Sequence, residues 1–220
     1  MTPGGALASG GIHMIIASTI ASQSQSSVPD LRFKAAGWAS FLGVFLVIPA
    51  IVTAILADKI PPVVLIYVPI IVVGNACAIY VLIQFKRLLN ERCDFHGVDG
   101  IIIALIVISL VFASIDAIIM VVTTLIIPSA KVGSTGIAIF IMLLVVLGIL
   151  GIIMGARLLA VQENVSGLLR PFAILAIISS SCQTTIILLP ITCLLLIPCS
   201  VIMGMMLLRA ANAEPQVEFV

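Results

Sequence analysis

The sequence predicts an all-α fold: a polytopic membrane bundle of six transmembrane helices arranged as three hairpins. Three observations predict it. Of the 220 residues, 62% are hydrophobic and 9% are charged, whereas soluble domains are about 45–50% apolar and about 25% charged. The apolar residues form runs of about twenty, the length that crosses a bilayer. The basic residues also segregate to one side of the expected crossings. This composition excludes a cytosolic enzyme, a secreted disulfide scaffold and a disordered linker.

The first expected hairpin joins spans at about 36–57 and 63–85. Asp30 precedes the first span and is suited to cap it, and Trp38 lies where an aromatic ring meets the membrane interface. The turn at 58–62 contains paired prolines, which cannot continue a helix.

The second expected hairpin joins spans at about 100–127 and 134–156. It follows a polar loop predicted at 86–99, whose last residue, Asp99, is suited to cap the third span. Residues 172–208 then contain no charge. A single helix of that length would measure about 55 Å, against a hydrocarbon core of roughly 30 Å.

We therefore expect the charge-free stretch to fold back at Pro190. This gives a third hairpin from spans at about 171–188 and 191–208. Pro171 suits the first turn of the fifth span, and neighbouring helices can accommodate a kink at Pro198 in the sixth.

Both ends of the chain are expected to differ from the transmembrane domain at 36–209. Residues 1–35 are predicted to form a polar or interfacial segment. Its weakly apolar run at 6–21 is short for a span, and an extra short span or a cleaved signal remains an alternative. A secretory signal needs a positive region before its apolar core, yet the first basic residue is Arg32. Residues 210–220 are expected to form a cytoplasmic tail.

The basic residues predict the orientation. With six spans, eight of them fall on one side of the membrane and two on the other. Because positive residues are retained inside, both termini are expected in the cytoplasm. The eight are Arg32, Lys34, Lys86, Arg87, Arg92, Arg157, Arg170 and Arg209, and the two are Lys59 and Lys131.

Two motifs carry a resemblance to known proteins. They are FKRLLNERCDFHGVD at Phe85–Asp99, which an Ile-rich span follows, and GLLRPFA at Gly167–Ala173. The chain resembles small uncharacterised bacterial multi-pass inner-membrane proteins in these motifs, which cover about a tenth of its length. The resemblance implies a bacterial inner membrane. It implies no activity and supplies no site residues.

Asp116 is the one ionisable residue well inside a predicted span. An aspartate at a helix centre costs about 2.5–3.5 kcal/mol on insertion. Ser109, Asp116 and Thr123 share one helix face because they are spaced by seven. Two interpretations stay open: an ion or proton site, or a carboxyl that is protonated, bonded to a neighbouring helix or close to the outer surface. The candidate partners, which can equally join helices by hydrogen bonds, are Asn75, Gln183, Thr184 and Thr185.

A small-residue face lies in the fourth predicted span. Gly151 and Gly155 form a G-x-x-x-G pattern, which Gly148 extends. Such faces let helix backbones approach closely. The face is expected to pack either within the protomer or against a partner helix.

No other pattern indicates chemistry. Cys93 and His96 are too few for a structural zinc site, which needs four ligands. No histidine occurs in the six predicted spans, so a haem ligated inside the membrane is not expected, and we predict no metal and no cofactor. The five cysteines are expected to be free thiols. There is no basic block to bind nucleic acid.

These observations predict an integral membrane protein that is not an enzyme. The leading hypothesis is a structural or accessory component that works within the lipid bilayer by packing with itself or with other membrane subunits. The alternative is a small channel or transporter in which Asp116 is the ion or proton site, with Asn75 and Gln183 beside it.

Overall fold

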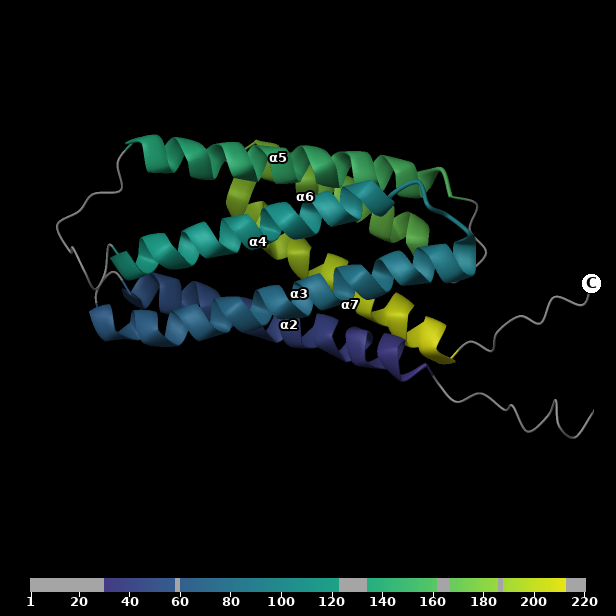
Figure 1. The fold of residues 1–220 in the computed structure, drawn as a ribbon, viewed down its shortest axis with the longest axis horizontal. Helices are drawn as coiled ribbons and strands as arrows, with labels where there is room; N and C mark the ends of the chain where they lie inside the picture. The colour runs from purple at the N-terminus through teal and green to yellow at the C-terminus, as the bar shows by residue number, and fades with distance from the viewer. Residues whose placement is uncertain (1–29, 58–59, 123–133, 162–166, 186–187, 213–220) are drawn as a thin grey trace, which may run out of the picture.

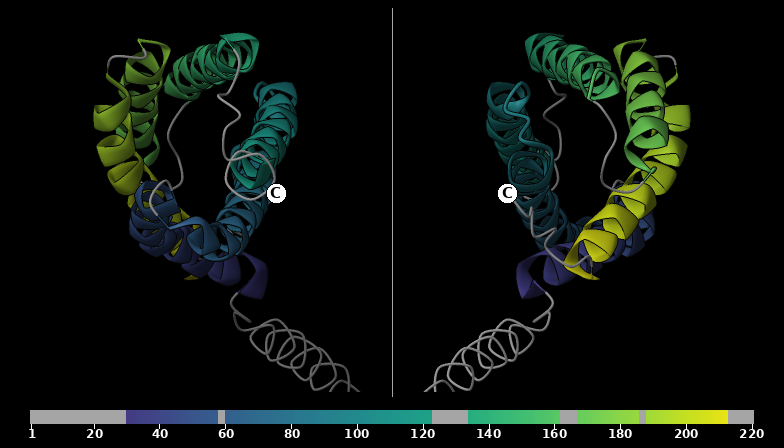
Figure 2. Two further views of the ribbon diagram at one scale, coloured as in Figure 1. Left: turned by 90° about the vertical axis from the view of Figure 1, so that its left-hand side faces the viewer. Right: turned by 90° about the vertical axis from the view of Figure 1, so that its right-hand side faces the viewer.

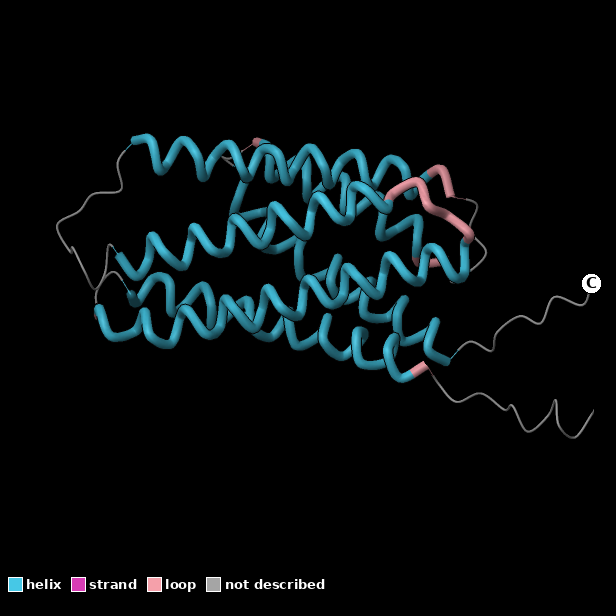
Figure 3. The backbone as a smooth tube through the Cα atoms, in the orientation of Figure 1, coloured by secondary structure: helices cyan, strands magenta, loops and turns pink. Residues whose placement is uncertain are grey.

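The computed structural model describes residues 30–57, 60–122, 134–161, 167–185 and 188–212. Its described regular structure is entirely helical, as Figure 3 shows. Five helices are long and apolar enough to cross a membrane. The chain is therefore a multi-pass membrane protein with an all-helical fold. Predictions that fall outside the described residues are those for 1–29, the turn at 58–59, the end of the third span at 123–127, residues 186–187 of the fifth span, and the tail at 213–220.

The described helices follow the order of the predicted hydrophobic segments. They are α2 (Leu31–Ala57), α3 (Val64–Cys93), α4 (Asp99–Val121), α5 (Ser134–Leu159), α6 (Leu169–Thr184) and α7 (Leu189–Asn212), with a 3-10 turn, η1, at Pro61–Val63.

Asp30 starts α2 as predicted, but the helix begins earlier than residue 36. Asp30 Oδ1 accepts a hydrogen bond from the backbone N–H of Arg32 at 3.1 Å, which satisfies a donor that every helix start leaves free. The same carboxylate forms an ion pair with the Arg32 side chain. The predicted N-terminal segment at 1–35 is therefore wrong for residues 31–35, which belong to α2.

The predicted loop at 86–99 is wrong for residues 86–93, which continue α3. Lysine, arginine, leucine and glutamate are good helix formers, so the helix persists after its residues become polar. Asp94 ends it in a left-handed conformation with φ 46°, and its backbone N–H bonds the Leu89 carbonyl. Hydropathy shows where the apolar stretch ends, but it does not show where the helix ends, because polar residues continue α3 to Cys93.

Asp99 does not cap α4 but is its first residue. Val98 occupies the cap position without a side-chain hydrogen bond. The Asp99 carboxylate accepts a hydrogen bond from Asn90 Nδ2 at 3.1 Å and lies 3.7 Å from Lys86 Nζ. A negative charge in the first turn still favours the helix through the helix dipole.

The chain folds back between α6 and α7 as expected, but the break precedes Pro190. α6 ends at Thr184 and α7 begins at Leu189. Pro190 therefore lies in the first turn of α7, where a helix needs no proline N–H. α6 has 16 residues, a length of about 24 Å, and it is not among the five helices long enough to span.

The six described helices form a ring in chain order. Each one packs on the next, and α2 also packs on α7, which closes the ring. The end-on views in Figure 2 show α5 across the ring from α2. The most extensive pairings are α5 with α6, α2 with α3 and α2 with α7. These contacts do not single out three separate hairpins.

The most densely buried part of the bundle is the end where α3 and α5 finish and α6 begins. Its largest fully buried side chains include Phe85, Leu88, Ile102, Leu158 and Leu207. The rings of Phe85 and Phe172 meet edge to face with their centroids 5.4 Å apart, a favoured aromatic geometry.

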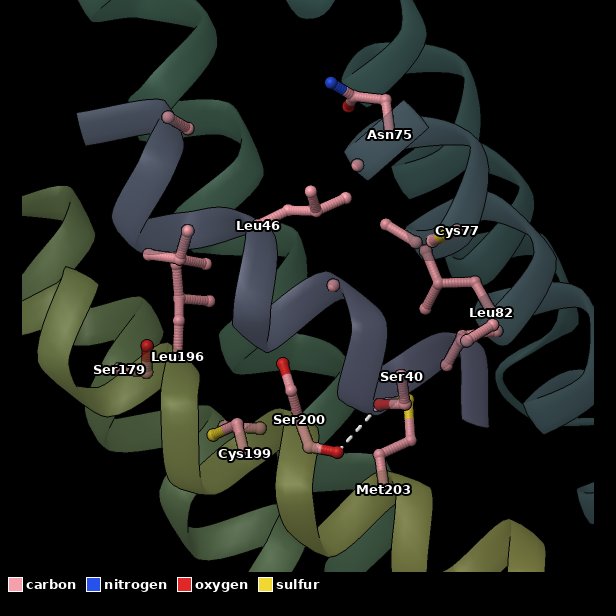
Figure 4. A pocket seen from close by; sticks show the side chains of 18 of the residues that line it. Ser40, Leu46, Asn75, Cys77, Leu82, Ser179, Leu196, Cys199, Ser200 and Met203 are labelled. Carbon is pink, nitrogen blue, oxygen red and sulfur yellow. Dashed lines mark hydrogen bonds between the residues drawn. The ribbon is translucent and has the colours of Figure 1, made fainter. Parts of the chain in front are cut away.

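Glycines allow α2 and α7 to close the ring. A Cβ added at Gly37 would lie 2.6 Å from Leu208 Cγ and 3.1 Å from the Gly204 carbonyl oxygen. One turn further along α2, Ser40 Oγ donates a hydrogen bond to the Ser200 carbonyl at 2.7 Å, as Figure 4 shows. Close backbone approach and one interhelical hydrogen bond thus hold the first and last helices together.

Gly37→Leu is expected to loosen the α2–α7 contact and lower the free energy of unfolding by about 1–3 kcal/mol, a common cost of overpacking. Gly43→Leu is the matched control, because a Cβ at Gly43 meets nothing within 4 Å. Thermal unfolding in mild detergent checks both. Equal losses of stability in the two variants would contradict this description of the ring closure.

Candidate functional site

Asp116 is held by a tyrosine of the neighbouring helix. Tyr67 Oη in α3 donates a hydrogen bond to Asp116 Oδ2 in α4 at 2.6 Å. Tyr67 is buried and Asp116 is partly buried. An O–H···O bond of this length to a carboxylate is at the strong end of the range. On the predicted Asp116 face, Ser109 is partly buried, and Thr123 lies outside the described residues.

The expected partners Asn75 and Gln183 do not reach Asp116. Asn75 Nδ2 donates to the Ile71 carbonyl of its own helix at 2.9 Å. Gln183 Nε2 donates to the Leu144 carbonyl of α5 at 3.4 Å. Gln183 therefore joins two helices, while Asn75 satisfies its amide N–H locally.

Thr184 and Thr185 also bond elsewhere. Their hydroxyls donate to the Ser181 carbonyl at 2.8 Å and 2.9 Å, at the point where α6 ends. Tyr67 is not among the predicted partners, which are amides and threonines, yet it is the residue that bonds Asp116. The available signal was the tyrosine itself, since a buried phenol hydroxyl usually finds a hydrogen-bond partner.

A cavity of about 520 Å³ lies between α2, α3, α6 and α7 (Figure 4). It brings together Asn75 on α3 and Gln183 on α6, although Asp116 does not line it. Most of the lining is apolar, and none of the described lining residues carries a charge. Hydroxyl-bearing residues line it as well, namely Ser40, Ser179, Ser180 and Ser200.

The small-residue face of α5 packs against α6 within the protomer. A Cβ added at Gly155 would lie 2.9 Å from the Ala173 carbonyl oxygen. One added at Gly148 would lie 2.9 Å from the Ser180 carbonyl oxygen, and one at Gly151 would lie 2.9 Å from Ser180 Cβ. The face is therefore occupied by the chain's own helix.

The connection between α3 and α4 is a polar elbow. His96 Nδ1 lies 3.4 Å from Asp99 Oδ2, and Arg157 of α5 donates to the Gly97 carbonyl. Within the described ranges, no group of three or more His, Cys, Asp or Glu residues could hold a metal ion. All five cysteines are free, and Cys199 is the buried one among them.

Gly151→Leu is expected to push α5 away from α6 and to lower the free energy of unfolding by about 1–3 kcal/mol. Its oligomeric state in mild detergent should not change, because the face lies inside the protomer. Gly100→Leu is the control, since a Cβ there meets nothing within 4 Å. Lost assembly with unchanged thermal stability would instead show that this face binds a partner helix.

Comparison with known proteins finds no match to this chain among protein-family models, curated proteins or solved structures. The bacterial inner membrane that the two motifs imply therefore stays a prediction. What the site can do follows from its own geometry: a carboxyl bonded to a tyrosine between α3 and α4, and an uncharged cavity with a few hydrogen-bonding groups.

Proposed function

We propose that this chain enters a bacterial inner membrane as six helices in three successive hairpins, with both termini in the cytoplasm. In the third hairpin the short α6 turns back into α7 inside the bilayer. The distribution of charge over the fold supports this. The start of α2, the ends of α3, α5 and α7 and the start of α6 lie at one end of the bundle in Figure 1. These helix ends carry the basic residues Arg32, Lys34, Lys86, Arg87, Arg92, Arg157, Arg170 and Arg209. One positive end of a membrane bundle is typical of the cytoplasmic side.

In that membrane the protein acts as a non-catalytic structural or accessory component that packs with itself or with a larger membrane complex. The supporting observation is the apolar surface of α2, where Phe45, Ile48 and Ile55 are 75%, 65% and 59% exposed. The polar Thr53 on the same helix donates its hydroxyl to the Pro49 carbonyl at 2.7 Å. The helix thus offers side chains suited to lipid tails and to helices of a neighbouring subunit.

Purification in mild detergent, followed by identification of the proteins that travel with the chain, tests this role. We expect the chain to migrate with a larger membrane complex or as a homo-oligomer. Phe45→Ser should weaken that assembly without lowering thermal stability, because its side chain is exposed. A monomer that conducts ions or protons in liposomes would contradict the proposal.

A small channel or transporter with Asp116 as its ion or proton site is the second candidate. The hydrogen bond between Tyr67 and Asp116 favours it, because it holds a titratable carboxyl between two helices that cross the membrane. Asn75 and Gln183 would then act from the neighbouring cavity, where both line the wall.

Asp116→Asn separates the two candidates, because it keeps an acceptor for the Tyr67 hydroxyl and removes the ionisable group. Under the structural role, the variant should insert and assemble like the wild type. Tyr67→Phe should cost about 0.6 kcal/mol, and at most about 1.7, as interhelical hydrogen bonds in membranes do. Proton and cation flux into liposomes, measured with a trapped dye, distinguishes the structural role from transport. Flux in the wild type that Asp116→Asn abolishes would establish transport.

A further inference from the structure

α6 stops part-way along the bundle. Its last residue, Thr184, packs against Gly148 of α5. α5 begins at Ser134, so it extends about 20 Å beyond that contact, at 1.5 Å per residue. Figure 1 shows the same relation, with α6 shorter than α5 and α3 at one end. A helix that ends inside a membrane bundle is tolerated where it borders protein or a cavity, and such interrupted helices often form binding sites.

The cavity lies beside this short helix. Gln183, one residue before the end of α6, lines it together with Asn75 of α3. Asn75 lies about 16 Å along α3 from its start at Val64, at 1.5 Å per residue, which is near the middle of a roughly 30 Å hydrocarbon core. The cavity therefore lies at the depth of the lipid tails.

Two glycines keep the cavity open. Gly43 of α2 and Gly74 of α3 both line it, and a Cβ at either meets nothing within 4 Å. The glycines at helix contacts behave differently, because a Cβ at Gly37 or Gly151 would collide with the neighbouring helix. Close packing therefore explains the contact glycines but not Gly43 and Gly74.

The cavity also contains unused hydrogen-bonding groups. Asn75 and Gln183 use their amide N–H groups on backbone carbonyls, which leaves their amide oxygens as acceptors. Ser179 is 6% exposed and lines the cavity, and its hydroxyl makes no hydrogen bond within the described part of the chain. Ser179 therefore offers the cavity a hydroxyl that can donate or accept a hydrogen bond from a bound polar atom.

We infer that the cavity binds an uncharged, mostly apolar small molecule from the membrane, with one hydroxyl or carbonyl head group. The head group bonds to Ser179 and Gln183, which lie one turn apart on α6, and the apolar body fills the space beside Gly43 and Gly74. A charged ligand is disfavoured because the described lining residues offer no opposite charge. The volume lies within the range of about 300–1,000 Å³ that is usual for small-molecule sites.

Retinol, a neutral isoprenoid alcohol, is a suitable probe. It absorbs where tryptophan emits, and the chain has a single tryptophan, Trp38, which directly precedes the lining residues Ala39 and Ser40. In phosphatidylcholine nanodiscs we expect retinol to quench Trp38 emission saturably. Retinoic acid at alkaline pH has the same skeleton and an ionised carboxyl, so it should bind at least about tenfold more weakly.

Gly74→Leu should fill the cavity and abolish saturable quenching, and Gly43→Leu should do the same from the opposite wall. Gly100→Leu is the matched control, because its Cβ also meets open space but lies outside the cavity lining. Ser179→Ala keeps the space and removes the hydroxyl, so it should weaken retinol binding by about tenfold, the effect of losing a buried hydrogen bond.

Three results would overturn the inference: no saturable quenching in the wild type, quenching in both cavity-filling variants equal to that in Gly100→Leu, or retinoate binding as tightly as retinol. Thermal unfolding of each variant is the control for misfolding, since the two cavity-filling variants should be at least as stable as the wild type. Native mass spectrometry of protein taken directly from membranes gives a second readout. An uncharged lipid adduct should accompany the wild type and be absent from Gly74→Leu.

Discussion

Every backbone N–H and C=O group in hydrocarbon must find its partner inside the protein, because lipid tails offer none. Long helices meet this requirement, and several polar side chains of this chain meet it in the same way. Ser114 donates its hydroxyl to the Leu110 carbonyl of its own helix, and Thr192 donates to the carbonyl of Leu188, the residue before α7. Where α6 ends, Thr184 and Thr185 share the carbonyl of Ser181. The ring can therefore contain serine, threonine and amide side chains and still present an apolar surface to lipid.

The separation between helices is set by side-chain size, and the glycines divide into two groups. At Gly37 and Gly155 the backbone of one helix nearly touches the next, as in other membrane bundles. At Gly43 and Gly74 the same residue type faces open space. Tight contacts on one set of helix faces and a cavity on another can thus coexist in one ring. The proposed packing role concerns the outer surface, and the proposed ligand concerns the interior.

The membrane class and the order of the hydrophobic segments were predictable, because a chain this apolar has no aqueous fold available to it. Helix ends were less predictable. Hydropathy placed the end of the second span at 85, whereas α3 continues to Cys93, since polar residues can remain helical outside lipid. The pair of Tyr67 with Asp116 and the cavity around Asn75 depend on how helices rotate and cross. Residue spacing along one helix does not predict how that helix rotates and crosses its neighbours, because rotation and crossing depend on contacts between residues distant in sequence.

The ring itself is tested most directly by cross-linking its first and last helices. Ser40 and Ser200 are joined by a hydrogen bond between α2 and α7. In a cysteine-free background, Ser40→Cys with Ser200→Cys should react with a short thiol cross-linker within single chains in native membranes. Ser40→Cys with Ser109→Cys, on α4, is the control and should not react. Cross-links of the first pair that form only between chains, or equal reaction of the control pair, would contradict a ring closed by α2 and α7.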